Sequence, residues 1–249
     1  MRIAVISDIH GNIDALDAVF EDIARQGVDA VVNLGDSLSG PFDAHATAER
    51  LMARDDLTIS GNHDRALWDR PRDEMGQWED WVADDLTPGQ IDWLLALPKT
   101  AEMGGVFFCH ATPDSDEENW LDYRSPLQRL VARDLSGVLS RMSDISATVL
   151  CCGHTHAPRI VRLPTGQLIV NPGSVGCPAY FDTRFEPHFI QETGAPDARY
   201  AILEERNGVW SAALRAVPYD SRRMARMARD RGAESWAQAV ETGWITPPV

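Results

Sequence analysis

Short apolar runs alternate with longer amphipathic stretches in the first part of the chain. Arg2–Ile6 is a β-branched, apolar run typical of a buried strand, and the apolar positions within 13–23 recur with the spacing of one helix face. The same order continues with strands predicted at 28–34 and 57–60 and a helix at 44–52 between them. Strands that alternate with helices in this way indicate a largely parallel, buried sheet.

The apolar pattern continues to the end of the chain with less regular spacing. Further strands are predicted at 106–109, 148–152, 159–163, 167–170, 198–204 and 209–217. The last two alternate apolar and polar residues as antiparallel strands do. A helix is expected at about 125–141, an irregular loop at 177–197, and a helical tail at about 219–249.

Residues 66–98 differ from their surroundings, because four of the eight tryptophans lie here among many acidic residues. Thr87-Pro88 is typical of a helix N-cap and first turn, and it predicts a helix through Leu97. We therefore expect a helical insertion over one edge of the sheet. Its tryptophans either pack the insertion on the main body, the favoured interpretation, or stack on a substrate.

Length and composition are those of an ordinary globular protein. The 249 residues are enough for one α/β domain spanning 1–249, with hydrophobic content of 44% and charged content of 24%. No apolar run approaches the ~20 residues of a membrane span. Asp8 and His10 interrupt the apolar N-terminal stretch, which disfavours a signal peptide. Four cysteines without framework spacing suggest buried thiols, and we expect a cytoplasmic protein.

The formal net charge is −15. Such a charge disfavours an extended nucleic-acid surface or an anionic membrane as a partner. Any anionic substrate must be attracted by a local feature that overrides this field.

Polar side chains that can bind metal follow the predicted strands one after another. They are Asp8, His10, Asp36, Asn62, His63, His110, His154 and His156. Each residue alone could be an ordinary turn or surface residue. Their joint occurrence at the strand ends is not explained in this way. Ligands bind beyond the carboxyl ends of such strands. Oxygen and imidazole ligands without cysteine suit Mn, Fe, Zn, Co or Ni. The set is too large for one tetrahedral ion but large enough for two ions that share a carboxylate, even with one of the eight side chains left out as a non-ligand.

Five ordered motifs carry a resemblance to a known family. Those motifs are Asp8-x-His10, Gly35-Asp36, Gly61-Asn62-His63-Asp64, His110 and Gly153-His154-x-His156. Together they resemble the calcineurin-like metallophosphoesterases, and the turn Asn171-Pro172-Gly173-Ser174 resembles the small bacterial branch that includes the YfcE-type phosphodiesterases. The resemblance implies an α/β fold built as a four-layer αββα sandwich, with two mixed sheets flanked by helices.

The same resemblance implies a role for each motif residue. Asp8, His10 and His156 would hold one divalent metal, and Asn62, His110 and His154 a second, with Asp36 bridging the two. A metal-bridging hydroxide would attack the phosphorus of a small phosphate ester, with a nucleotide as one candidate, and His63 would protonate the leaving oxygen. Manganese is favoured, and a phosphodiester is favoured over a monoester.

Two other functions are consistent with parts of this pattern. Relatives of the fold serve as metal-binding scaffolds without turnover, but they differ from the enzymes at the catalytic histidine, which is present here as His63. Serine/threonine protein phosphatases follow their Asn-His element with Glu and carry Asp-Arg-Gly after Gly-Asp. This chain has Asp64 and Ser37-Leu38-Ser39-Gly40 at those places, so an enzyme outside that branch is preferred.

Several residues keep two interpretations at this stage. Asp64 either caps a helix, which is favoured, or orients its neighbours, and Asn12 is either a pocket donor or a turn former. The loop at 177–197 either shapes a substrate pocket or covers a dimer contact, so a homo-oligomer stays open. The C-terminal arginines are expected to pair with the acidic body, an anion- or partner-binding helix being the alternative. His45 and His188 lie outside every motif.

Overall fold

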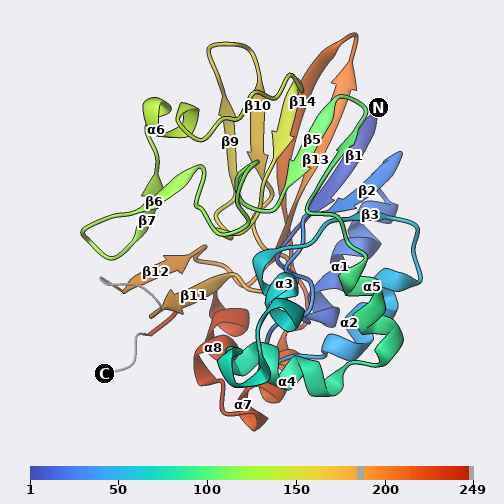
Figure 1. Ribbon diagram of the computed structural model, residues 1–249, viewed down its shortest axis with the longest axis vertical. Helices are drawn as coiled ribbons and strands as arrows, with labels where there is room; N and C mark the ends of the chain where they lie inside the picture. The colour runs from blue at the N-terminus through green and yellow to red at the C-terminus, as the bar shows by residue number, and fades with distance from the viewer. Residues whose placement is uncertain (184–187, 247–249) are drawn as a thin grey trace.

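Two five-stranded mixed sheets pack face to face in the computed structural model, which describes residues 1–183 and 188–246 (Figure 1). The first sheet has the order β14-β13-β1-β2-β3, in which β1 pairs in parallel with β2 and antiparallel with β13. Its strands are β1 (Arg2–Ile6), β2 (Ala30–Asn33), β3 (Leu57–Thr58), β13 (Ala198–Arg206) and β14 (Val209–Val217).

The second sheet has the order β4-β5-β8-β10-β9, with β5, β8 and β10 parallel to one another. Its strands are β4 (Thr100–Met103), β5 (Val106–Cys109), β8 (Val149–Cys151), β9 (Arg159–Arg162) and β10 (Leu168–Asn171). Strand β4 was not expected from the sequence. It forms because Gly104 and Gly105, both with positive φ, allow a tight turn back onto β5.

Alternation along the strands divides the core into layers. Ile3 and Val5 of β1 point toward the second sheet and meet Phe108, while Ala4 and Ile6 point to the helices on the other side. Burial on both faces explains why the central strands are continuous apolar runs.

Helices cover the two outer faces to different extents. The first sheet is covered by α1 (Ile13–Ala24), α2 (Ala44–Met52), α7 (Arg222–Asp230) and α8 (Glu234–Thr242). Trp120 and Leu121, together with the short α6 (Leu135–Leu139), cover the second sheet. The four-layer α/β sandwich predicted from the sequence is therefore confirmed, with a thin fourth layer.

The segment at 66–98 is helical, as expected. It contains the end of α3 (Asn62–Asp69), then η1 (Arg72–Glu74), α4 (Gln77–Asp85) and α5 (Pro88–Leu95). Thr87 caps α5 in a capping box with Gln90. The tryptophans of this segment pack against the main body or on one another, which agrees with the favoured interpretation.

The prediction of one helix at about 125–141 is wrong. The chain instead forms a hairpin of β6 (Asp122–Arg124) and β7 (Leu130–Ala132), followed by α6. Ser125-Pro126 opens the turn, which closes with Gln128 at a φ of 58° and a bond from the Ser125 N–H to the Arg129 carbonyl. The Ser125 hydroxyl also accepts from the Arg129 N–H at 3.4 Å, a local side chain-to-backbone bond that competes with helix formation.

The irregular loop expected at 177–197 also contains regular structure. A second hairpin forms from β11 (Ala179–Asp182) and β12 (Phe189–Glu192), because Ala179 and Ile190 bury their side chains against α8. Phe185, one of the aromatic residues in this loop, lies outside the described residues, as do 247–249 of the tail. The tail otherwise contains two helices, α7 and α8, as expected.

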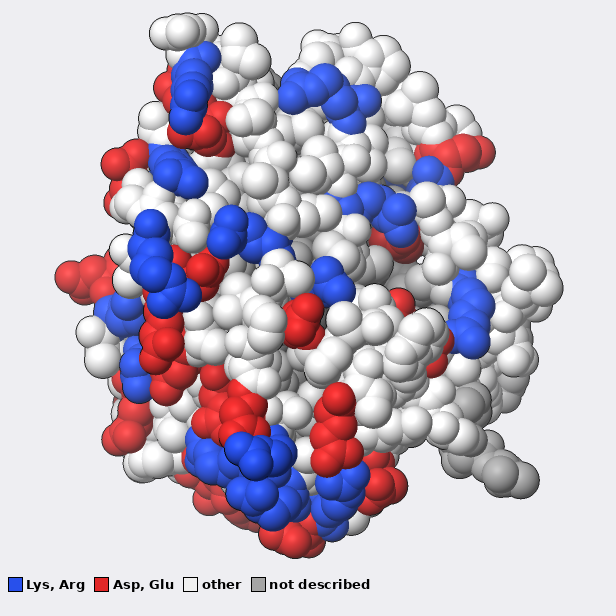
Figure 2. Space-filling view, turned by 180° about the vertical axis from the view of Figure 1, so that it is seen from behind, with Lys and Arg blue, Asp and Glu red and all other residues white. Residues whose placement is uncertain are grey.

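Basic and acidic side chains lie interspersed on the face shown in Figure 2, including its lower edge. Arg223 of α7 pairs with Asp14 and Asp43, and Arg231 pairs with Asp85, whereas Arg229 pairs with Glu241 within the tail. The favoured interpretation of a helix paired with the acidic body therefore agrees with the structure. All four cysteines are buried free thiols, and no helix in the described part of the chain has the length and apolarity to cross a bilayer.

Candidate metal centre and catalytic histidine

The candidate ligands all lie where strands end, on one edge of the two sheets. Asp8 and His10 follow β1, Asp36 follows β2, and Asn62 and His63 open α3 after β3. From the second sheet, His110 follows β5, and His154 and His156 follow β8. Residues that are almost 150 positions apart therefore meet in a small volume, and all except His154 and His63 are buried.

Five of these residues have an unusual backbone conformation. Of the seven described non-glycine residues with positive φ, five are the candidate ligands Asp8, His10, Asp36, His154 and His156, with φ between 53° and 66°. This region is sparsely populated for L-residues and costs of order 1–3 kcal/mol at each position. Such strain clusters at functional sites, because the surrounding structure must hold it in place.

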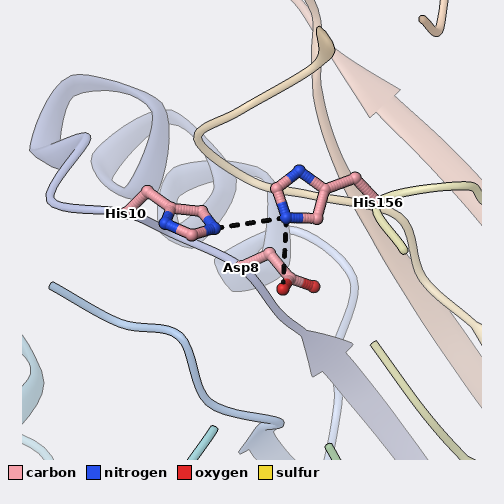
Figure 3. Close-up of side chains that lie close together, drawn as sticks. All are labelled: Asp8, His10 and His156. Atoms are coloured by element: carbon pink, nitrogen blue, oxygen red, sulfur yellow. Dashed lines mark hydrogen bonds and ion pairs between the residues drawn. The ribbon is translucent and has the colours of Figure 1, made fainter. Parts of the chain in front are cut away.

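Asp8, His10 and His156 form the first group of ligand atoms (Figure 3). The Nε2 atoms of His10 and His156 are 3.2 Å apart, and Nε2 of His156 is 3.4 Å from Oδ1 of Asp8. Among the described residues, that Oδ1 is a buried oxygen without a hydrogen-bond partner. Buried polar atoms are nearly always satisfied, so this oxygen fits a role as a cation ligand.

Backbone carbonyls fix the orientation of three imidazoles. Nδ1 of His10 binds the Ser39 carbonyl at 2.6 Å, Nδ1 of His156 binds the Cys177 carbonyl at 2.8 Å, and Nδ1 of His110 binds the Leu34 carbonyl at 2.7 Å. A carbonyl can only accept, so Nδ1 carries the proton in each ring. The Nε2 atoms are thereby directed at the cluster, an arrangement typical of metal-binding histidines.

Asp36, His110 and His154 form the second group. Nε2 of His110 lies 3.2 Å from Oδ2 of Asp36 and 3.1 Å from Oδ1 of Asn62. His154 differs from the other rings, because its Nδ1 faces inward and lies 2.9 Å from the same Asn62 oxygen. Four nitrogen and oxygen atoms of separate elements therefore converge here.

The electrostatics of the site divide the histidines into two kinds. Burial lowers the pKa of His10 to about 4 and that of His154 to about 3, with neighbouring imidazoles adding to the effect. Burial acts in the same direction on His110, but the Asp36 charge outweighs it and raises the pKa of His110 to about 10. Asp8 likewise raises the pKa of His156. The two carboxylates thus stabilise positive charge next to them, either on the protonated imidazoles or on divalent cations.

Asp64 holds the backbone on which Asp36 sits. Its carboxylate accepts from the backbone N–H groups of Asp36 at 2.7 Å, Ser37 at 2.9 Å and Gly61 at 3.0 Å. The last bond caps α3, so the favoured interpretation of Asp64 is confirmed, and the first two also orient its neighbours. Burial and the nearby Asp36 charge raise the pKa of Asp64 to about 6.

The turn at 174–176 fixes the position of Asp8, and Asn12 lies at the start of the next helix. Ser174 donates its hydroxyl to the Asp8 carbonyl at 2.7 Å, and the Gly176 N–H reaches the same oxygen at 3.1 Å. Asn12 accepts from the Ala15 N–H at 3.1 Å and is the N-cap of α1. Its amide nitrogen donates to the Gly176 carbonyl at 3.1 Å and to the Tyr219 hydroxyl at 3.0 Å, so Asn12 is a turn and cap residue whose donors are used within the fold.

His63 lies beside both ligand groups. Its backbone N–H donates to Oδ1 of Asp36 at 2.8 Å, and its ring is 5.5 Å from that of His10. Nδ1 of His63 is hydrogen-bonded to Oε1 of Glu79 in α4. Glu79 could not be singled out from the sequence, because it is one of many acidic residues in the segment at 66–98. Burial would raise the pKa of Glu79, but the contact with His63 lowers it.

Aromatic side chains surround the first ligand group on two sides. The Trp236 ring of α8 lies 5.6 Å from that of His10 and 5.5 Å from that of Trp78 in α4. On the other side, the Tyr180 ring of β11 lies 4.9 Å from that of His156. The insertion, the tail and the hairpin all reach the site.

The sequence model of the calcineurin-like phosphoesterase superfamily domain matches residues 1–190. The chain belongs to this superfamily. The family predicted from the five motifs is thereby confirmed. Members of this superfamily are phosphoesterases that use divalent metals, and the structure contains two groups of residues that could hold such ions.

Individual relatives are distant in sequence. The uncharacterized protein MJ0912 of Methanocaldococcus jannaschii is 26% identical over 228 residues, which cover 82% of this chain and 83% of that protein. The crystal structure of a metallophosphoesterase from Sphaerobacter thermophilus matches with a TM-score of 0.72 at 22% identity, covering 98% of this chain and 99% of that one. A provisionally assigned diadenosine tetraphosphatase matches with a TM-score of 0.53 at 15% identity, covering 86% and 93%. These structures share the fold.

Proposed function

We propose that this protein is a dinuclear metal-dependent phosphoesterase that cleaves a phosphodiester bond with water as the nucleophile. One observation carries the proposal. Three imidazoles are fixed through Nδ1 by backbone carbonyls, so that their Nε2 atoms face the Asp8 and Asp36 carboxylates. This arrangement needs residues from the ends of four strands, β1, β2, β5 and β8, and packing alone does not require it.

The proposed assignment of ligands follows the two groups. Asp8, His10 and His156 would hold one cation, and Asn62, His110 and His154 the other, with the Asp36 carboxylate shared between them. Nitrogen and oxygen donors without thiolate suit Mn, Fe, Zn, Co or Ni, and we favour Mn. The proposal gives all seven side chains the roles that the motifs suggest.

The chemistry of such a site follows from charge. Two divalent cations would stabilise the charge that develops on phosphate oxygens and would lower the pKa of a bound water. Their four positive charges exceed the two negative charges of Asp8 and Asp36, so an anionic ester is attracted locally despite the net charge of −15. His63 keeps 24% of its side chain exposed and lies beside both groups, where it can protonate a leaving oxygen. General acid catalysis of this kind contributes roughly 10²–10⁴-fold.

We propose a small phosphate ester as the substrate, with a nucleotide as one candidate, and a cytoplasmic location. A diadenosine polyphosphate belongs among the compounds to test, because a protein provisionally assigned to that activity shares the fold. Preference for a diester over a monoester is part of the proposal.

The test is a paired assay of the Mn²⁺-loaded protein with bis-p-nitrophenyl phosphate and p-nitrophenyl phosphate. Chelated protein and His63→Ala are the essential variants. His45→Ala is the matched control, because His45 lies in α2 and binds Gln90, away from the strand ends. Metal content is measured by elemental analysis for every sample.

We expect faster turnover of the diester, which chelation abolishes and His63→Ala reduces by at least about 100-fold. His45→Ala should match the wild type. Monoester preference would overturn the diesterase assignment while keeping the enzyme. No turnover of either ester or of diadenosine tetraphosphate, with two metals bound, would contradict enzymatic function and favour a metal-binding scaffold.

A further inference from the structure

A buried carboxylate from the helical insertion faces the imidazole of His63. Glu79 lies in the first turn of α4, and only 4% of the residue is exposed. Its Oε1 is hydrogen-bonded to Nδ1 of His63, whereas the His63 side chain itself is 24% exposed. One side of this ring is therefore held by protein, and another part of it reaches solvent.

The contact determines which ring nitrogen carries the proton. A carboxylate only accepts, so a neutral His63 next to Glu79 carries its proton on Nδ1, and a protonated His63 presents Nε2–H on its other side. The backbone N–H of the same residue is fixed by Asp36 at 2.8 Å. Ring and backbone are thus held by two separate carboxylates, from different elements.

Helix α4 is itself held by contacts with the C-terminal helical segment. Trp78 packs edge to face on Trp236 of α8, and Asp85 pairs with Arg231 after α7 at 2.7 Å. Gly76 precedes the helix, and a Cβ at this position would lie 2.3 Å from Oε2 of Glu79. The glycine leaves room for the Glu79 carboxylate to lie over the start of the helix.

We propose that Glu79 is a positioning residue for the reaction proposed above: it accepts the Nδ1–H of His63 and directs Nε2 to the leaving oxygen. The inference rests on that proposed function and gives the helical insertion a part in it. A merely structural alternative is that Glu79 stabilises the N-terminus of α4, where acidic residues are generally favourable. The two differ in their effect on the leaving group.

The experiment compares Glu79→Ala and Glu79→Gln with the wild type. Asp80→Asn is the matched control, since the neighbouring Asp80 of the same turn is 46% exposed and pairs with Arg72. Kinetics are measured on Mn²⁺-loaded protein with a series of aryl phosphodiesters whose leaving phenols range from p-nitrophenol to unsubstituted phenol. The ¹⁵N spectrum of the imidazoles is recorded on metal-free protein, and thermal unfolding is followed for each variant.

A leaving phenol of high pKa needs protonation more than p-nitrophenol does. We therefore expect Glu79→Ala to lower kcat for the phenol ester about 10-fold more than for the p-nitrophenol ester, with KM and metal content nearly unchanged. Glu79→Gln should fall between Ala and the wild type, because its amide oxygen still accepts the Nδ1–H. The double variant Glu79→Ala with His63→Ala should be no slower than His63→Ala alone. In the ¹⁵N spectrum, His63 should leave the Nδ1–H tautomer in Glu79→Ala and keep it in Asp80→Asn.

Equal losses for all leaving groups, or an unchanged tautomer, would overturn the positioning role. A lower unfolding temperature with unchanged kinetics would show that Glu79 only stabilises α4. If the wild type hydrolysed no ester, the proposed function would fail and the positioning role with it. Turnover by a wild type that Glu79→Ala matches would refute the positioning role alone.

Discussion

Replacing Asp64 by alanine should separate the support of the site from its ligands. Asp64 is fully buried. Its carboxylate accepts three hydrogen bonds, all from backbone N–H groups, those of Asp36, Ser37 and Gly61. These bonds join the end of β2 to the start of α3. The substitution therefore loosens two strand exits without removing a candidate ligand.

The magnitude follows from the three donors. Leaving a buried N–H without its acceptor costs about 1–3 kcal/mol, so three of them correspond to about 3–9 kcal/mol. Water that enters the space of the missing carboxylate recovers part of this, and we expect a loss of about 3–5 kcal/mol in the free energy of unfolding. Domains of this kind are stable by about 5–15 kcal/mol, so the variant should still fold. Asp64→Asn keeps one acceptor oxygen and should lose about half as much.

Urea unfolding followed by circular dichroism measures the effect, with chelator present so that metal binding does not compensate. Asp73→Ala is the matched control, because Asp73 is an exposed acidic residue in the nearby η1. We also expect a weaker affinity of Asp64→Ala for Mn²⁺, since Asp36 loses the bond that holds its backbone. A variant within 1 kcal/mol of the wild type, or with unchanged affinity, would refute this account.

Three further predictions concern packing, acid stability and metal removal. A Cβ on Gly61 would lie 2.2 Å from Oδ1 of Asp36. Gly61→Ala should therefore lower the free energy of unfolding in urea by about 1–3 kcal/mol and reduce the amount of bound metal. Gly89 has open space around it, so the control Gly89→Ala should be neutral or stabilising. Burial would raise the pKa of Asp22, but hydrogen bonds from Tyr200 (2.5 Å) and Arg215 (2.9 Å) outweigh it and lower this pKa. The stabilisation by the ionised Asp22 is therefore present above pH 4 and is lost as the pH falls through the lowered pKa. Asp22→Asn should melt about 3–6 °C below the wild type at pH 7 and approach it near pH 2. Chelation should lower the melting temperature of the wild type by about 5–10 °C, reversibly on addition of Mn²⁺, because a ligand at 100 times its Kd stabilises by about 2.7 kcal/mol; unchanged melting would contradict bound metal.

The sequence was informative where strands and polar residues coincide. The strand at Arg2–Ile6 and its exit residues Asp8 and His10 could be predicted, because burial on both faces produces a continuous apolar run and the exit produces its abrupt end. Parallel pairing then requires the exits to share one edge, which brings Asp36 beside Asp8 although 28 residues separate them. The family and the grouping of the candidate ligands could thus be predicted, while their positive φ angles could not.

Elements that depend on distant partners were missed or mispredicted. The helix expected at about 125–141 is replaced by a hairpin, because Arg133 donates to the carbonyls of Asn119, Trp120 and Asp122 and ties β7 to the preceding loop. The hairpin of β11 and β12 forms where α8 offers an apolar surface, which lies more than 40 residues further along the chain. Glu79 was missed for the same reason, since nothing in its local sequence shows that its partner is His63.

Two kinds of residue form the site: motif residues at the strand ends, and residues of the helical insertion and the C-terminal tail. Motif residues on the strand ends carry the candidate ligand atoms, and five of these residues have a strained backbone. Asp64 and Ser174 hold the backbone of Asp36 and Asp8 in place. The insertion and the tail contribute no candidate ligand among the described residues, yet Glu79 and Trp236 contact His63 and His10. Under the proposed function, changes in these two segments would alter how the leaving group or the substrate is held, while the candidate metal ligands stay the same. That division predicts that variants of Trp236 should change KM or the leaving-group dependence before they change metal content.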